Sequence, residues 1–189
     1  MNQERRDRLR DAAIGLLAGS SSRGLTHRAV DAAADVPPGT TKNYFPTRDA
    51  LLQAAAERIF ELYAAVPRPA PTDRASLTAL IVALLENATG PARARLLAFY
   101  ELRGEAPRAP WLASAVDAFS AADFAYFEQA QRAAGLPVTP QRAATVTLAL
   151  HAALFHLLAE GPATIAAAGL DDLDRFVREL LDTVYGTAT

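Results

Sequence analysis

Apolar residues recur at helical spacing in almost every segment of the chain, and no stretch alternates polar and apolar residues for long enough to favour a strand. Residues that break helices separate these segments. They lie at Gly19 to Gly24, Asp35 to Gly39, Pro46, Pro67 to Pro71, Gly90-Pro91, Gly104 to Pro110, Gly135 to Pro140, Gly161-Pro162 and Gly169. The pattern predicts an all-α fold of about nine helices.

The N-terminal segment predicts three helices, of which the second and third are short. The first covers residues 3–18 and places its Leu residues on one face, so it needs a partner to pack against. Thr26 is a suitable N-cap for the second, which extends to Ala34. Asp35-Val36-Pro37 then forms a bend, and the third helix covers residues 38–44 with Pro38 in its first position. Helix, tight turn and helix in this order are typical of a DNA-binding motif.

The two short helices have distinct faces. Their apolar contact is expected from Val30, Ala33, Val36 and Phe45. The outward residues of the third helix are Thr40, Lys42 and Asn43, which are polar or cationic and suited to base edges and phosphates.

The stretch from Gly24 to Val30 and the stretch from Val36 to Leu52 closely resemble the DNA-binding domain of the tetracycline-repressor (TetR/AcrR) family. In that family a Gly-Thr is followed by Tyr or His, Phe, a Ser/Thr cap, a basic residue, an acid and a Leu pair, as residues 39–52 read here. The sequence departs from the family at Pro37, Thr41 and Lys42, so the operator sequence does not transfer.

The resemblance implies a helix-turn-helix domain over residues 1–55, followed by a ligand-binding and dimerisation domain over residues 56–189. It makes Thr26, Tyr44 and Arg48 phosphate contacts. It also makes residues on both short helices base-reading or groove-facing, and the complete expected DNA-binding set is Thr26, His27, Arg28, Thr40, Lys42, Asn43, Tyr44 and Arg48. A helix from Thr47 to about Ala65 is expected to join the two domains.

Ten of the fourteen aromatic residues lie between Phe60 and Phe155. Aromatic side chains form cores as readily as they line pockets, and the family resemblance is what favours a pocket for a small, largely apolar effector. The candidate ligand-binding residues are Tyr63, Asn87, Tyr100, Arg103, Trp111, Phe119, Asp123, Phe127 and His151. Asp123 lies on an apolar stripe and either points inward, which favours a cationic or hydrogen-bond-donating ligand, or faces solvent.

The last predicted helix, about residues 171–185, carries an apolar stripe that requires burial. In the resembled family the last two helices of each subunit form a dimer interface, although packing within one chain explains part of the same surface. The residues expected at a homodimer interface are Leu150, Leu154, Leu173, Phe176, Val177, Leu180 and Val184.

Charge and composition limit the classes of function further. Residues 1–48 hold eight basic against five acidic side chains and residues 49–189 hold eleven against sixteen, so basic charge gathers where a DNA module would use it. The chain has no Cys, and His156 with Glu160 provides only two potential ligands, so we expect no metal site and no cofactor. We expect a cytoplasmic protein without a membrane helix, since the N-terminus is charged and the uncharged run 143–159 is short.

These observations favour a ligand-responsive transcriptional regulator, a repressor released from palindromic operator DNA by a small effector. An enzyme is the alternative class, but the sequence contains neither a phosphate-binding loop nor a nucleophile elbow. A third alternative is a helical interaction protein without a role at DNA.

Overall fold

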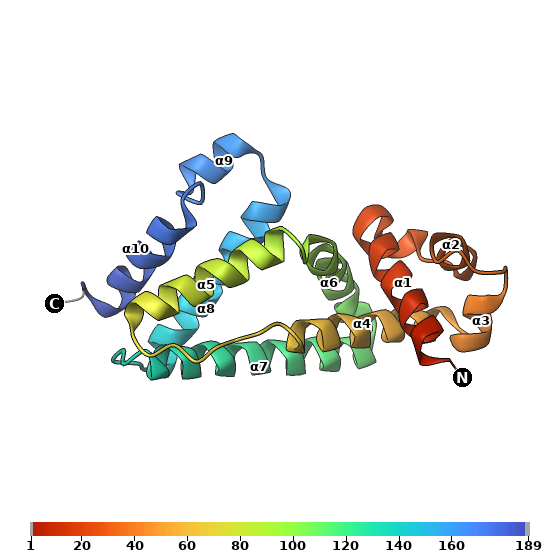
Figure 1. Cartoon of the computed structure of the whole chain (residues 1–189), viewed down its shortest axis with the longest axis horizontal. Helices are drawn as coiled ribbons and strands as arrows, with labels where there is room; N and C mark the ends of the chain where they lie inside the picture. The colour runs from red at the N-terminus through yellow and green to blue at the C-terminus, as the bar shows by residue number, and fades with distance from the viewer. Residues whose placement is uncertain (1, 188–189) are drawn as a thin grey trace. The chain divides into compact units, whose positions relative to one another are not determined.

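The computed structural model describes residues 2–187, with the exception of the Ser21 side chain, and confirms the all-α prediction (Figure 1). Over these residues it contains ten α-helices and one 3-10 helix. In chain order they are α1 (Gln3–Gly24), α2 (His27–Ala33), α3 (Thr40–Tyr44), α4 (Arg48–Ala64), α5 (Arg74–Thr89), α6 (Arg93–Glu105), η1 (Ala106–Arg108), α7 (Pro110–Ala133), α8 (Pro140–Ala159), α9 (Pro162–Ala167) and α10 (Leu173–Tyr185).

The chain divides into two compact units, and the first is discontinuous in sequence. Unit 1 comprises Met1–Val66 and Ala94–Asp117, and unit 2 comprises Pro67–Arg93 and Ala118–Thr189. The helix-turn-helix therefore shares unit 1 with most of α6. The functional boundary expected between residues 55 and 56 falls inside α4 and stays a prediction.

Helix α1 is longer than predicted, because the segment Gly19–Gly24 is helical and not a surface loop. The Ser20 hydroxyl donates to the Leu16 carbonyl one turn back. Ser22 is buried, and its hydroxyl donates to the Glu105 carboxylate of α6 at 2.7 Å. These contacts compensate for the weak helix propensity of Gly and Ser. The prediction from sequence took only that propensity into account.

Two details of the helix-turn-helix also differ from prediction. Helix α3 begins at Thr40 and not at Pro38, because Gly39 adopts a left-handed conformation with φ of 90° that ends any helical path through the turn. Ala33, expected in the contact between the short helices, is exposed, and the adjacent Ala34 is buried in its place. Val30 and Phe45 are buried as expected, whereas Val36 is half-buried.

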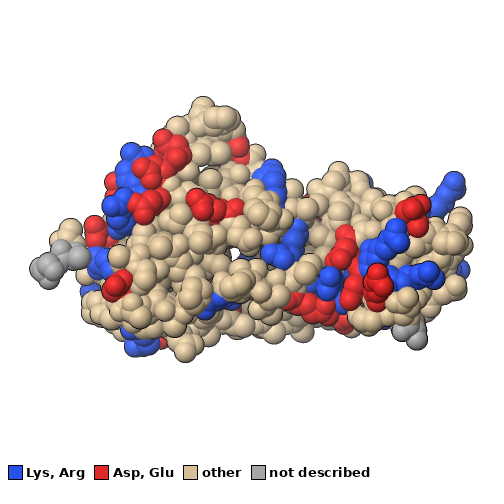
Figure 2. All heavy atoms as spheres, viewed as in Figure 1, with Lys and Arg blue, Asp and Glu red and all other residues tan. Residues whose placement is uncertain are grey.

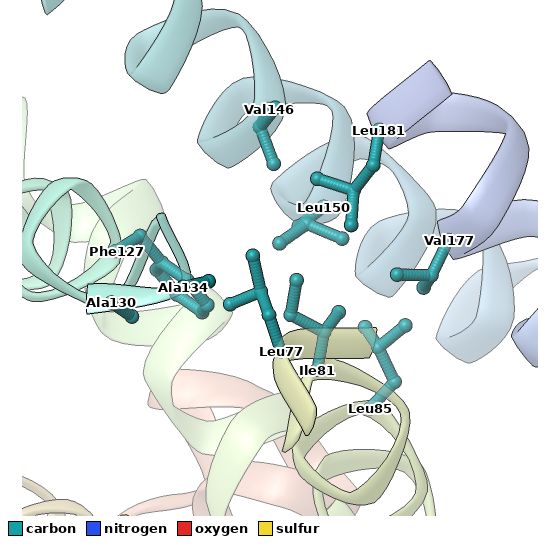
Figure 3. Close-up of a cluster of buried hydrophobic side chains, with 10 residues drawn as sticks. All are labelled: Leu77, Ile81, Leu85, Phe127, Ala130, Ala134, Val146, Leu150, Val177 and Leu181. Atoms are coloured by element: carbon teal, nitrogen blue, oxygen red, sulfur yellow. The ribbon is translucent and has the colours of Figure 1, made fainter. Parts of the chain in front are cut away.

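The core of unit 2 forms where α5, α7, α8 and α10 converge (Figure 3). Its buried members are Leu77, Ile81, Leu85, Phe127, Ala130, Ala134, Val146, Leu150, Val177 and Leu181. Gln131 lies among them with none of its surface exposed. Its amide donates to the Phe127 carbonyl at 2.9 Å and accepts from the Tyr185 hydroxyl at 2.8 Å, so the buried polar group is satisfied at both ends.

Helix α8 is long and apolar enough, by length and composition alone, to cross a membrane. The core helix of a soluble protein passes the same test. Ala143, Val146 and Leu150 of α8 are buried within unit 2, and in all 33 % of its most apolar stretch is buried.

Candidate functional site

Local contacts hold the helix-turn-helix in shape. The Thr26 hydroxyl accepts a hydrogen bond from the Ala29 amide and caps α2, as predicted. Asp35 has a positive φ of 51°, which Asp tolerates better than most residues and which allows the sharp turn after α2. Phe45 is 2 % exposed and anchors the end of α3 in the core of unit 1.

Five of the residues expected to contact DNA, four facing the groove and Tyr44 at a phosphate, lie on two neighbouring helices of unit 1. Arg28 of α2 and Lys42 and Asn43 of α3 are exposed. Thr40 is half-buried, and its hydroxyl donates to the Pro37 carbonyl. Tyr44 is also half-buried, with its ring centroid 6.3 Å from that of Phe45. The exposed side chains therefore provide two cations and an amide, the donor-rich set that phosphates and purine edges attract.

Two further members of the predicted DNA-binding set have partners inside unit 1. A ring nitrogen of His27 lies 2.6 Å from the Phe45 carbonyl oxygen and donates to it, which ties α2 to the end of α3. The Arg48 guanidinium donates to the Ser22 carbonyl at 2.7 Å, near the end of α1. Arg48 has further N–H donors that this bond does not use, so a phosphate contact and the internal contact are compatible.

Charges of both signs mark the surface of this unit. On the face drawn in Figure 2, Lys and Arg lie intermixed with Asp and Glu over the region of α1 to α4. The basic excess of the N-terminal segment is thus partly neutralised by neighbouring carboxylates, such as those of Asp7 and Glu61 beside Arg10. The surface of the helix-turn-helix is therefore not uniformly basic, and its free positive charge is that of the cations without such partners.

Sequence reasoning missed Asp31. This α2 residue is 4 % exposed, and its carboxylate accepts from the Gly39 amide at 2.7 Å, the Thr41 amide at 2.7 Å and the Thr41 hydroxyl at 2.6 Å. Burial raises the Asp31 pKa, but these hydrogen bonds outweigh it and hold the pKa below the usual value. Thr41 in an otherwise apolar position was the available signal, since a buried hydroxyl needs a partner.

The ligand-binding candidates include one pair that the structure brings together. Asp123 of α7 is 6 % exposed and therefore points inward, and its carboxylate accepts from the His151 ring of α8 at 2.8 Å. The Phe124 ring stands edge-on to His151, with centroids 5.6 Å apart. The result is a buried carboxylate and an imidazole, in contact with an aromatic ring, within unit 2.

A second polar group lies on the same helix. The Tyr126 hydroxyl is buried, and within the described residues it has no hydrogen-bond partner. Burial raises the Tyr126 pKa, and the Asp123 carboxylate raises it further against an opposing effect of Arg68, whose guanidinium lies 4.7 Å from the Tyr126 ring centroid. The hydroxyl is therefore neutral near pH 7 and suited to hydrogen bonding with a ligand.

The remaining candidates occupy varied environments. In unit 2, Phe127 is a member of the hydrophobic core, while Asn87 and Phe119 are half-buried. In unit 1, Arg103 is exposed. Tyr63, Tyr100 and Trp111 of that unit are half-buried. Their role in ligand binding stays a prediction.

The residues expected at a dimer interface separate into two sets. Leu150 and Val177 are buried in the core of unit 2, against which the other expected interface residues pack. Half-buried side chains lie at the edge of that core, namely Leu154, Leu173, Phe176, Leu180 and Val184. Leu148 and Phe155 of α8, which were not among the expected residues, are 58 % and 50 % exposed.

His156 and Glu160 approach to 4.0 Å at the end of α8. Over residues 2–187 no group of three or more His, Cys, Asp or Glu side chains is arranged to hold a metal ion. The pair is a side-chain contact near a helix end.

Comparison with known proteins identifies the family. Residues 72–183 match the model of the tetracyclin repressor-like C-terminal domain, which covers more than half of the chain. This helical protein with an N-terminal helix-turn-helix is a transcription regulator, and it belongs to the TetR family. No curated protein matches the sequence.

Solved structures extend the likeness to almost the whole chain. A TetR-family member from Streptomyces coelicolor is 26 % identical with a TM-score of 0.69, and the match covers 97 % of this chain and 99 % of that one. The multidrug binding protein EbrR, complexed with ethidium, is 28 % identical with a TM-score of 0.67 over the same shares. A putative TetR-family regulator from Rhodococcus is 24 % identical with a TM-score of 0.72, over 96 % and 98 % of the two chains, and supports the fold.

Proposed function

We propose that this TetR-family regulator is a repressor that binds palindromic operator DNA as a homodimer and is released by a small, largely apolar effector. The observation that carries the proposal is the exposed polar face of the helix-turn-helix, where Arg28, Lys42 and Asn43 are presented by two helices with a common buried anchor, Phe45. Solvated side chains on rigid helices are the means by which such motifs read a groove.

Exposed apolar side chains on α8 support a homodimer interface formed by α8 and α10. Beyond its first turn, where Pro140 and Arg142 are also exposed, the exposed positions of α8 repeat at intervals of three and four. With Gln141 they form one stripe, which continues through Thr145, Leu148, Ala152, Phe155 and Ala159. None of these side chains carries a charge, and two are large and apolar. A second copy of the chain would cover such a stripe, since an apolar surface of this kind is typical of an interface.

The effector chemistry follows from the environment of Asp123. A buried carboxylate beside aromatic rings favours a ligand that combines an apolar body with a cationic or hydrogen-bond-donating group. The Tyr126 hydroxyl offers a further hydrogen bond. EbrR, a relative of similar length, has been crystallised with ethidium and with proflavin, which agrees with this ligand class. We place the protein in the cytoplasm, with its DNA target.

The test is selection of duplex DNA from a random pool by the purified protein. We expect an inverted repeat whose half-sites lie about 10 base pairs apart, one helical turn, because each subunit of a dimer reads one half-site. The triple variant Arg28→Ala/Lys42→Ala/Asn43→Ala should lose this operator in gel-shift titrations.

A matched control separates groove reading from general attraction. Arg108→Ala/Arg132→Ala removes two exposed cations outside the helix-turn-helix, the same loss of charge. It should keep operator affinity within about threefold, because neither cation belongs to the helix-turn-helix and salt screens charges that do not contact the DNA. Unchanged operator affinity in the triple variant, or no enriched sequence at all, would refute the proposal.

A further inference from the structure

Helix α3 has only five residues and no cap from its own sequence. Its N-cap is Gly39, which has no side chain to accept a hydrogen bond from the first amides of the helix. So short a helix makes few internal hydrogen bonds, and its position must come from contacts with other elements.

Asp31 of α2 provides that contact. Its two carboxylate oxygens bind the amides of Gly39 and Thr41, which flank the first residue of α3, and one of them also accepts from the Thr41 hydroxyl. A negative charge at this end of a helix is favourable, and hydrogen bonds to an ionised acceptor are short and strong. Asp31 thus caps α3 from a neighbouring helix.

The cap connects the two sets of groove-facing residues. Arg28 precedes Asp31 by one turn of α2, and Lys42 and Asn43 directly follow Thr41. Thr41 is completely buried, so its hydroxyl cannot exchange this partner for water. Any loss of the carboxylate therefore lets α3 move relative to α2, and the exposed side chains lose their relative register.

We propose that Asp31 is a positioning residue for DNA recognition, which fixes α3 against α2 through Gly39 and Thr41 and thereby sets operator specificity without touching DNA. This inference rests on the proposed DNA-binding function. A positioning role predicts different effects on operator DNA and on random DNA, whereas a purely structural role predicts equal effects on both. A misplaced but folded α3 keeps its cations, and so keeps its affinity for random DNA while losing preference for the operator.

The experiment compares operator and random-sequence DNA in the full-length protein. Asp31→Asn replaces one acceptor oxygen with an NH₂ group that faces amide donors. At a temperature where circular dichroism shows the variant folded, we expect operator affinity to fall about tenfold, and affinity for random DNA to change less than about twofold. The control is Asp35→Asn, an exposed Asp in the same turn whose left-handed backbone Asn also accepts. It should bind both DNAs as the wild type does.

Thr41→Val provides a second, milder variant. It removes one of the three hydrogen bonds and keeps the side-chain shape, so operator preference should fall about threefold, and adding it to Asp31→Asn should cost little more because both act on one contact. Wild-type preference in a folded Asp31→Asn or Thr41→Val protein would overturn the inference, as would an equal loss for both DNAs. If the wild-type protein itself shows no preference, the proposed function fails instead.

Discussion

Arg10 of α1 and Glu61 of α4 form a two-point ion pair, with guanidinium nitrogens 3.0 and 2.6 Å from the two carboxylate oxygens. The Arg10 side chain is 3 % exposed, and its third contact is a 3.0 Å bond from Nε to the Ala54 carbonyl. The long α1 and the helix that follows the helix-turn-helix are therefore joined by one buried cation within unit 1.

Replacing Arg10 should destabilise this unit. Arg10→Met retains much of the apolar stem but removes the hydrogen bonds to Glu61, Asp7 and Ala54, so we expect a loss of about 1–3 kcal/mol in the free energy of unfolding. Urea denaturation followed by circular dichroism measures it. Arg58→Met, which breaks the more exposed pair with Asp11, is the control and should cost less than about 1 kcal/mol. Equal losses of unfolding free energy in the two variants would contradict the stabilising role given to Arg10.

The same pair predicts a pH dependence. The hydrogen bond from Arg10 lowers the Glu61 pKa below its usual value of 4.5, against a smaller opposing effect of burial. Because the folded-state pKa is the lower one, the stabilisation is complete above the unfolded value and is lost as the pH falls through the folded value. Glu61→Gln should therefore be less stable than the wild type at neutral pH and similar to it in strong acid. A difference in urea midpoint that is constant from neutral pH to about pH 3 would exclude this linkage.

Tyr185 at the end of α10 contributes to the stability of unit 2 through Gln131. Tyr185→Phe leaves the Gln131 oxygen without its donor in a fully buried position, and should cost about 1–3 kcal/mol. Tyr185→Phe/Gln131→Met removes both polar partners and should cost less than the sum of the two single changes. Thermal denaturation of the four proteins measures the coupling, and strict additivity would show that the bond contributes nothing.

The exposed stripe of α8 predicts the oligomeric state. Leu148→Glu/Phe155→Glu places two charges in the proposed interface, where burying an unpaired carboxylate is costly, and should give folded monomers. Sedimentation at micromolar concentration distinguishes monomer from dimer. Ala79→Glu/Ala83→Glu, at exposed positions of α5, is the matched control and should remain dimeric. Dimers of the α8 variant would place the interface elsewhere.

Asp123 predicts the response to a cationic ligand. With ethidium as the probe, Asp123→Asn should weaken binding about tenfold, because the buried charge opposite the cation is lost. Asp117→Asn changes an exposed carboxylate earlier on the same helix and should bind as the wild type does. Fluorescence titration gives both affinities. Equal affinities in the two variants would remove Asp123 from the proposed ligand site.

The sequence predicted those features that depend on neighbouring residues and missed those that depend on distant ones. The caps Thr26 and Thr47 were recognisable, because a hydroxyl before an apolar run has a local acceptor role. The last turn of α1 was not, since the carboxylate that binds the Ser22 hydroxyl lies 83 positions away. The inward orientation of Asp123 was left open because its partner, His151, is on another helix.

That long-range bond at Ser22 has a consequence for biosynthesis. Glu101 and Glu105 of α6, which accept from the Ser22 amide and hydroxyl, are synthesised after all of α1 to α4. The helix-turn-helix end of the chain therefore emerges first but completes its packing only when α6 returns to it. Closing so long a loop is a step that local helix formation cannot replace, and it sets the order in which the nascent protein matures.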